Sequence, residues 1–245
     1  MNKIFLSNNI LYKIYLYYNL FYRYGAFKKK FTYSQNQEDL FINDYFKDLK
    51  SGFYIDIGCY HPIRYSNTAL LFNRGWKGIN IDMNQTSIDL FNLIRKSDIN
   101  ICAAISDTHN EVTQFTDHLF SPINTINKNF SKIISKKLST KKFLEKKIIT
   151  YTFDQIIKKN KIEIDIIDFL NIDVESHDFE VLQSIDLLKF KPKIICIEIE
   201  NSLNNYNDKK IKNYLEKYNY YLIKKIGLNG IFEHKKIKLS FSYDN

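Results

Sequence analysis

The feature that most constrains the fold of this 245-residue chain is a series of short apolar segments that alternate with helical patterns. The strand candidates are residues 53–57, 78–82, 99–105, 167–173 and 193–199. Helical patterns lie between them at residues 66–74, 85–96, 152–160 and 177–189. Strands that are apolar throughout, each followed by a helix, are typical of a parallel sheet covered on both faces. The sequence therefore predicts an α/β fold, Rossmann-like, with a mostly parallel sheet.

Both ends of this pattern carry further elements. Ser34 precedes a helical pattern that runs through Phe46, and its side chain suits the N-cap position. Near the other end, a helix at about 207–218 is followed by two strands, Tyr220–Ile226 and Gly230–His234. The glycine-containing turn between these strands predicts an antiparallel hairpin at the edge of the sheet.

The chain length suits one domain, residues 31–245, with an appendage. Residues 1–30 form an arm rich in Tyr, Phe, Leu and Ile, with Lys or Arg at intervals. Two interpretations stay open for this arm: a helix packed on the domain or on a second subunit, or a peripheral helix on an anionic membrane surface. Residues 115–147 are lysine-rich and irregular in pattern, as expected for a substrate lid inserted into an α/β scaffold.

The formal net charge is +9, mostly from lysine. Such lysine is typical of a solvated surface, and an anionic membrane or glycan is the alternative. We expect no nucleic-acid partner, because no binding motif accompanies the charge. Three separated cysteines and no cleavable signal peptide predict a cytoplasmic protein, with contact to the inner face of the membrane as an option. Nothing in the sequence fixes the oligomeric state.

The first chemical motif is a strand that ends at Asp56 and turns at Gly58, with a second acidic strand end at Asp82. Dinucleotide sites use Gly-x-Gly-x-x-Gly to bring backbone amides to a pyrophosphate, and this chain has a single glycine there. A carboxylate at that turn would repel phosphates but suits the sulfonium and ammonium groups of S-adenosylmethionine. Asp82 is placed to accept hydrogen bonds from ribose hydroxyls.

The second motif follows the strand at 167–173. Asp173, Glu175 and His177 should face the same crevice, because ligands in open α/β sheets bind beyond the carboxyl ends of the strands. These three residues are the catalytic candidates, since a hydroxyl needs a base to attack a methyl group. A cluster of Asp173, Glu175, Asp178 and Glu198 offers oxygen ligands to Mg²⁺, but nothing fixes a ligand set and we assign no metal ligand.

Ordered motifs along residues 32–200 give the chain a family resemblance. It resembles FkbM-type, S-adenosylmethionine-dependent methyltransferases in segments that start at Tyr33, Gly52, Ser66, Gly75, Ala103, Asp168 and Lys191. The resemblance implies a seven-strand methyltransferase sheet, with Asp56 and Gly58 near the methionine part, Asp82 on the ribose, and Ala104 and Ser106 near the adenine. Asn67, from the matched Ser66–Thr68 segment, completes the expected cofactor-binding set. Ser176 and Gln37 depart from the family, which usually has Gly at both positions.

We therefore expect an S-adenosylmethionine-dependent O-methyltransferase for a hydroxyl-bearing small molecule or glycan, in polysaccharide or glycoconjugate biosynthesis. Ser121, Asn124 and Thr125 are the expected polar contacts for the acceptor. One alternative is an NAD-dependent sugar oxidoreductase or epimerase, for which the glycine triplet and a Tyr-x-x-x-Lys pair are missing. Another is a non-catalytic, membrane-associated module with a vestigial cofactor fold.

Overall fold

The computed structural model describes residues 9–118, 121–137, 143–199 and 206–235. Two parts of the predicted organisation, the first eight residues of the arm and residues 119–120 and 138–142 of the insert, lie outside the described residues. The helices are α2 (Asn9–Tyr17), the π-helical turn η1 (Tyr18–Arg23), α3 (Glu38–Tyr45), α4 (Ala69–Asn73), α5 (Gln85–Ile94), α6 (Lys128–Lys137), α7 (Phe153–Lys159), α8 (Asp178–Gln183), α9 (Leu187–Phe190) and α10 (Tyr206–Lys217).

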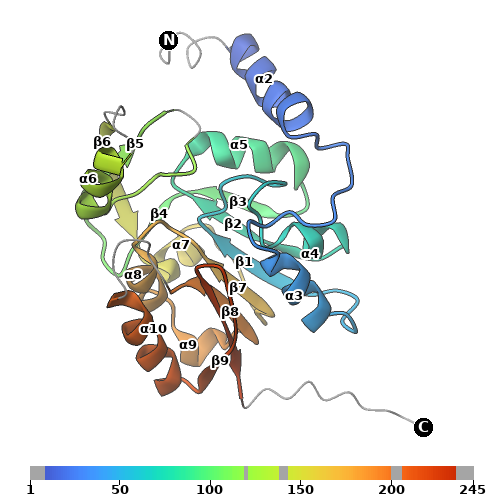
Figure 1. Cartoon of the computed structure of the whole chain (residues 1–245), viewed down its shortest axis with the longest axis vertical. Helices are drawn as coiled ribbons and strands as arrows, with labels where there is room; N and C mark the ends of the chain where they lie inside the picture. Colours follow the sequence, from blue (N-terminus) through green and yellow to red (C-terminus); the bar gives the residue numbers. More distant parts are fainter. Residues whose placement is uncertain (1–8, 119–120, 138–142, 200–205, 236–245) are drawn as a thin grey trace.

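The predicted mostly parallel sheet is confirmed, and it has seven strands in the order β3-β2-β1-β7-β8-β10-β9. Figure 1 shows it at the centre of the molecule. Its strands are β1 (Phe53–Ile57), β2 (Lys77–Asp82), β3 (Ile99–Cys102), β7 (Phe169–Ile172), β8 (Ile194–Glu198), β9 (Tyr220–Ile226) and β10 (Asn229–His234). The first five pair in parallel, and β10 and β9 form the predicted antiparallel hairpin at one edge.

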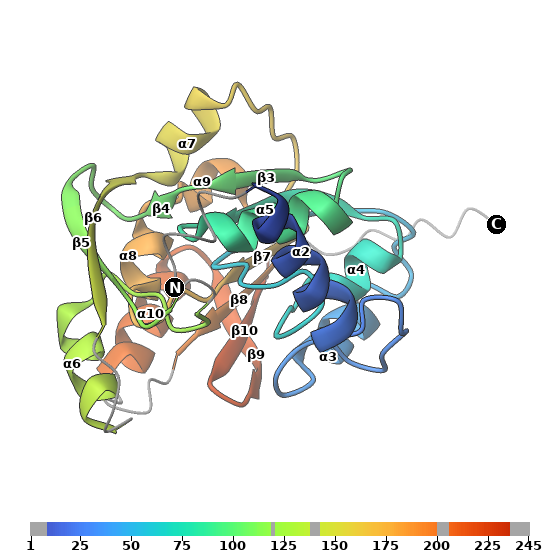
Figure 2. The same cartoon turned by 90° about the horizontal axis from the view of Figure 1, so that it is seen from above.

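Alternate side chains of the central strands enter two different cores. Ile55 and Ile57 of β1 pack with residues of α7, α8, α9 and α10. Tyr54 instead packs with Trp76 and with residues of α3 and α4. Both faces of the sheet are therefore buried (Figures 1 and 2), which explains why the strands are apolar throughout.

The predicted strand at residues 99–105 is wrong in its extent. After Ala103 donates its backbone N–H to Asp82, the chain leaves the main sheet, and β4 (Ala104–Ile105) pairs with β6 (Leu144–Tyr151). The prediction of an irregular insert at residues 115–147 is also wrong. β5 (Glu111–Thr116) and β6 form an antiparallel pair, α6 lies between them in sequence, and β4, β6 and β5 make a second sheet. The strands were missed because the adjacent, exposed Lys146 and Lys147 interrupt any alternation in β6, and β5 is mostly polar.

Two helix predictions need correction. Ser34 is not the N-cap: α3 begins at Glu38, after Gln37 turns the chain with a φ of 70°. The side chain of Ser34 nevertheless contacts the first turn of α3: its hydroxyl donates to the Asp39 carboxylate over 2.7 Å and accepts the backbone N–H of Asp39 over 3.3 Å. The predicted helix at 177–189 is two helices, because Asp186 accepts hydrogen bonds from the backbone of Leu188 and Lys189 and so starts α9.

The arm continues as a helix that lies against α5. Leu16 and Leu20 are buried with Leu90 of α5, and Tyr12 donates a 2.6 Å hydrogen bond to Asp89. Among the residues that the structure describes, no helix combines the length and the apolar character needed to span a bilayer.

A buried arginine joins the end of α5 to the sheet. The guanidinium of Arg95 donates to Thr68 over 2.7 Å, to Ser66 over 2.9 Å and to the carbonyl of Pro62 over 2.7 Å. Its charge lies among the carboxylates of Asp56 and Asp98, whose raised pKa values it partly offsets.

We expect Arg95→Met to lower the free energy of unfolding by about 3 kcal/mol or more, because it leaves two buried carboxylates without their cation. Urea unfolding followed by circular dichroism measures the change. Lys77→Met, at an exposed position, is the matched control and should stay within about 0.5 kcal/mol of the wild type. A loss below 1 kcal/mol for Arg95→Met would contradict this assignment.

Candidate active site

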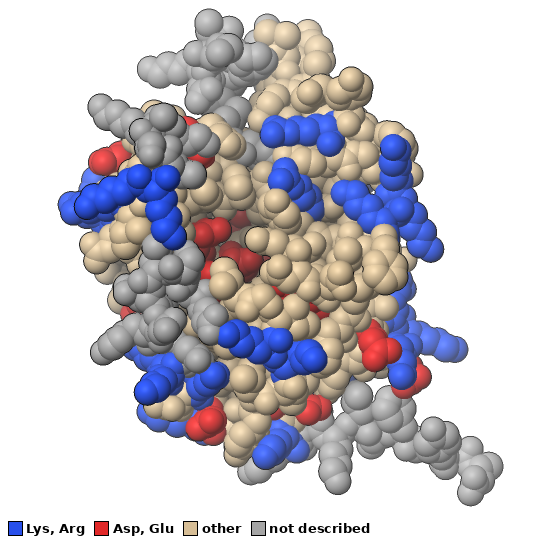
Figure 3. All heavy atoms as spheres, viewed as in Figure 1, with Lys and Arg blue, Asp and Glu red and all other residues tan. Residues whose placement is uncertain are grey.

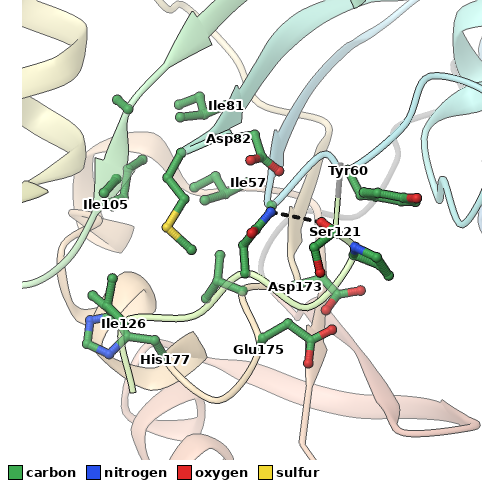
Figure 4. A pocket seen from close by; sticks show the side chains of 17 residues that line it. Ile57, Tyr60, Ile81, Asp82, Ile105, Ser121, Ile126, Asp173, Glu175 and His177 are labelled. Carbon is green, nitrogen blue, oxygen red and sulfur yellow. Dashed lines mark hydrogen bonds between the residues drawn. The ribbon is translucent and has the colours of Figure 1, made fainter. Parts of the chain in front are cut away.

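A pocket opens beyond the carboxyl ends of β1, β2 and β7, where an α/β sheet places its ligands. Including the part open to solvent, it holds about 560 Å³, within the range of small-molecule sites. Figure 3 shows acidic side chains at the bottom of this hollow, and Figure 4 shows its walls. The lining residues are Ile57, Gly58, Tyr60, Ile81, Asp82, Met83, Ala103, Ala104, Ile105, Ser121, Pro122, Asn124, Ile126, Asp173, Val174, Glu175 and His177.

Gly58 sits where the loops after β1 and β7 touch. Its φ is +87°, and a Cβ atom added there would lie 1.7 Å from the carbonyl oxygen of Asp173. Only glycine permits both this backbone conformation and this close approach. The predicted single glycine of the first motif is therefore required to bring the two loops together at the floor of the pocket.

Asp82 ends β2 and faces the pocket (Figure 4). One of its oxygens accepts a 2.6 Å hydrogen bond from the backbone N–H of Asn84, which fixes the carboxyl group. Burial, with a smaller contribution from Asp56, raises the pKa of Asp82 to about 7. A carboxyl group held in this way at a strand end is suited to accept hydrogen bonds from the hydroxyls of a ligand.

Asp173 and Glu175 bring two further carboxyl groups to the pocket, and in Figure 4 both lie on the side facing away from Ile105. Burial, with Asp56 and Glu38, raises the pKa of Asp173 to about 6. Burial and the charges of Asp173 and Asp178 raise the pKa of Glu175 to about 8. At neutral pH the pair therefore holds one carboxylate and one carboxylic acid.

His177 lies apart from this carboxyl pair, toward Ser106 and Ile126. Its Nε2 is 2.9 Å from the hydroxyl of Ser106, and its Nδ1 is 3.6 Å from Glu180. Burial lowers the pKa of His177, against the opposing effect of Glu180 and Asp107. Among the three catalytic candidates, the structure groups Asp173 with Glu175 and places His177 next to a residue expected near the adenine.

Three of the expected cofactor-binding residues, Asp56, Asn67 and Ser106, do not line the pocket. Asp56 is only 2% exposed, and its two oxygens accept hydrogen bonds from Thr68 over 2.6 Å and from Asn171 over 2.9 Å. Asn67 donates to Asn171 over 2.9 Å on the same face of the sheet. Successive side chains of a strand point to opposite faces of the sheet, so Asp56 lies on the same face as Tyr54, toward Arg95. Ser106 also does not line the pocket, but it contacts His177, which does.

The insert closes over the loop that carries the acids. Thr125 donates to the carbonyl of Glu175 over 2.9 Å, and Asn127 donates to the carbonyl of Ser176 over 3.0 Å. Glu175 and Ser176 have φ values of 55° and 70°, so the position where the family usually has Gly is indeed left-handed here. Ser121 and Asn124 line the pocket, as expected for polar contacts, whereas Thr125 is fully buried and holds the acidic loop.

One oxygen atom of the pocket residues stands out. The side chain of Asn124 donates to the carbonyl of Ser121 over 2.8 Å. Its Oδ1 is buried and has no hydrogen-bond partner in the described part of the chain. An orphaned acceptor of this kind is costly unless a ligand or a water satisfies it.

Asp173, Asp178 and Glu198 place one carboxylate oxygen each within 4.8 Å of one another. Burial and their mutual repulsion raise the pKa of Asp178 to about 8 and that of Glu198 to about 10. Protonation thus relieves the repulsion in this cluster. Nothing further points to a cation, so Mg²⁺ remains an option without an assigned ligand set.

Tyr60 and Met83 are pocket residues that the sequence reasoning missed. Both follow a strand end by one to three residues, after β1 and β2 respectively. Their positions just beyond strand ends could have identified them, because residues there border the ligand crevice whether or not they are charged.

The fold and the pocket together define a Rossmann-like methyltransferase fold. The model of the family described as methyltransferase FkbM domain matches residues 56–222, more than half of the chain. The chain therefore belongs to the FkbM methyltransferase family, as the sequence motifs predicted. Neither the curated proteins nor the solved structures contain a match to it.

Two glycines with nearly equal φ values allow the close approach at Gly58 to be tested. We expect Gly75→Ala, with a φ of +89° and nothing within 4 Å of the added Cβ, to lower the free energy of unfolding by roughly 1 kcal/mol. Gly58→Ala should cost several kcal/mol more and abolish ligand binding, because its Cβ overlaps Asp173. Equal losses in urea unfolding would show that the contact does not matter.

The raised pKa of Glu175 predicts a pH dependence of stability. Because the folded state holds this proton up to about pH 8 while the unfolded state loses it near 4.5, stability should fall as pH rises between these values. Glu175→Gln should make this fall shallower by up to about 1.4 kcal/mol per pH unit. Urea unfolding at pH 5, 6.5 and 8 measures the slope, and the exposed control Glu163→Gln should leave it unchanged.

Proposed function

We propose that the protein is an S-adenosylmethionine-dependent O-methyltransferase that methylates a hydroxyl group, that of a sugar in polysaccharide or glycoconjugate biosynthesis. The observation that carries the proposal is the division of the pocket into an apolar end and an acidic end, with the carboxyl group of Asp82 at the end of β2 facing the same pocket. S-adenosylmethionine is divided in the same way, because its flat adenine suits the apolar end and its cationic sulfonium suits the acidic end.

The donor set fits this cofactor. Ile81, Met83, Ala104 and Ile105 offer an apolar slot for a flat base, and Asp82 offers a fixed carboxyl to ribose hydroxyls. The carboxylate at Asp173, beside Gly58, would attract the sulfonium and ammonium charges. In this proposal Asp56 does not contact the cofactor. Its hydrogen bonds to Thr68 and Asn171 hold the end of β1, which Gly58 follows.

When bound, the cofactor supplies an electrophilic methyl group. The residues of the chain would orient an acceptor hydroxyl, exclude water and accept its proton. Asp173 is the base we assign, since it is the member of the carboxyl pair that is ionised at neutral pH. We place His177 with Ser106 at the nucleoside end of the pocket, where it shapes the wall.

The polar groups at the acidic end support a hydroxyl-rich acceptor. Ser121, the orphaned oxygen of Asn124 and the protonated carboxyl of Glu175 could each hydrogen-bond a sugar hydroxyl. These groups come from the insert and from the loop after β7, so the acceptor would enter between them.

We expect S-adenosylhomocysteine to bind the purified protein with micromolar affinity in calorimetry and NAD to give no response. Asp82→Asn should weaken that binding roughly 10- to 100-fold, because a charge-assisted hydrogen bond contributes about 1.5–3 kcal/mol. The exposed control Asp44→Asn should bind as the wild type does. Binding of NAD instead would favour the oxidoreductase, and binding of neither would favour the non-catalytic module.

Transfer of a labelled methyl group to lipid-linked or nucleotide-linked glycans then identifies the acceptor. Asp173→Asn should lose transfer by a factor of 100 or more, in the range of general-base catalysis. If Asp173→Asn transfers the label at the wild-type rate, the assigned base is wrong.

A further inference from the structure

The arm presents an exposed face that is apolar and aromatic. While Leu16 and Leu20 face α5, Tyr22 is 81% exposed, Ile10 71% and Ile14 59%. The other large exposed side chains of residues 9–31 are Leu11, Tyr17, Tyr18, Phe21, Phe27 and Phe31. A helix packed on a domain usually exposes polar residues on its outer side, so this face needs a partner of its own.

The helical segment Asn9–Arg23 is held firmly enough to present this face. Tyr12 is hydrogen-bonded to Asp89, and Leu20 is fully buried. Aromatic rings four residues apart stack in pairs on the outer side, Tyr17 with Phe21 at 5.9 Å and Tyr18 with Tyr22 at 5.3 Å between centroids. In Figures 1 and 2 the α2 helix lies at the outside of the molecule, next to α5.

The charges that the arm itself carries have one sign. The chain has no Asp or Glu before Glu38. Lys13, Arg23, Lys28 and Lys29 are exposed in the arm, and Lys28 lies over the ring of Phe27. Exposed aromatic and aliphatic side chains bordered by cations match the boundary between the headgroups and the acyl chains of an anionic bilayer.

We propose that the arm, Asn9–Phe31, is a docking surface for an anionic lipid bilayer, lying in the plane of the headgroups. A second copy of the chain fits this face less well, because a twofold contact would bring the four cations of each arm together without any acid of the arm to pair them. The proposal goes beyond the methyl transfer and does not depend on it.

The docked arm would also place the pocket near the lipid. Tyr60 lines the pocket and packs against the cluster formed by Leu16, Leu20 and Leu90. One side chain thus separates the lipid-facing helix from the site. An acceptor carried on a membrane lipid would reach such a site without leaving the bilayer surface.

Co-sedimentation of the full-length protein with vesicles tests the docking. The protein should sediment with phosphatidylglycerol-containing vesicles in low salt, far less with pure phosphatidylcholine, and less again in 0.5 M salt. Ile14→Ser/Tyr22→Ser should reduce the partition coefficient roughly tenfold or more, because both side chains leave the apolar layer. Ile166→Ser/Leu188→Ser, at positions 60% and 68% exposed outside the arm, should have no effect.

The charges are tested separately. Lys28→Glu/Lys29→Glu should reduce partition on the anionic vesicles by more than tenfold, because each lysine near the surface contributes on the order of fivefold. The exposed control pair Lys50→Glu/Lys77→Glu should leave partition unchanged. Point variants replace deletion of residues 1–30, because deletion would uncover Leu90. Calorimetry with S-adenosylhomocysteine provides a second readout that the arm variants should leave unchanged.

Three outcomes would overturn the proposal. The protein could fail to sediment with anionic vesicles, or the control pairs could lose as much partition as the arm pairs. Analytical ultracentrifugation without lipid could instead reveal a dimer that Ile14→Ser/Tyr22→Ser dissociates, which would assign the face to a second copy. None of these outcomes depends on methyl transfer, so the two proposals can fail independently.

Discussion

The buried guanidinium of Arg95 is the interaction on which the ordered strand ends depend. It is fully buried and hydrogen-bonds Thr68, which in turn holds Asp56 at the end of β1. It also binds the carbonyl of Pro62, in the loop that follows Gly58. One cation therefore offsets two buried acids and anchors the first loop of the pocket. A buried charge network of this kind contributes to a unique arrangement more than to net stability.

The pocket depends on a second constraint, the contact between the loops after β1 and β7. Because Gly58 has no side chain, the carbonyl of Asp173 can approach its backbone, and the loop then carries Asp173 and Glu175 into a partly dry space. Burial and crowding raise the pKa values of both acids. The same close packing that completes the floor of the pocket thus brings the pKa values of its acids closer to neutral.

The sequence predicted the main sheet well because its strands are buried on both faces, so that each one is a continuous apolar segment with a helix behind it. It predicted the second sheet poorly. In β6 the adjacent, exposed Lys146 and Lys147 interrupt any alternation, β5 is mostly polar, and β4 has only two residues, too few to show a period. The turn at Glu175 and Ser176 could not be predicted from residue type either, since its left-handed backbone is held by Thr125 and Asn127 of the distant insert.

The case of Asp56 shows that the sequence position of an acid at a strand end does not by itself say whether its side chain reaches the pocket. A carboxylate near Gly58 disfavours a pyrophosphate and favours a cation, whichever carboxylate it is. Alternation along β1 turns Asp56 away from the pocket, into the buried face that also holds Tyr54 and Arg95. Asp173 instead brings a carboxyl group to the pocket, from the end of a strand that is distant in sequence but adjacent in the sheet. The spacing within one strand gives the face of each side chain, and the order of strands in the sheet decides which acids meet.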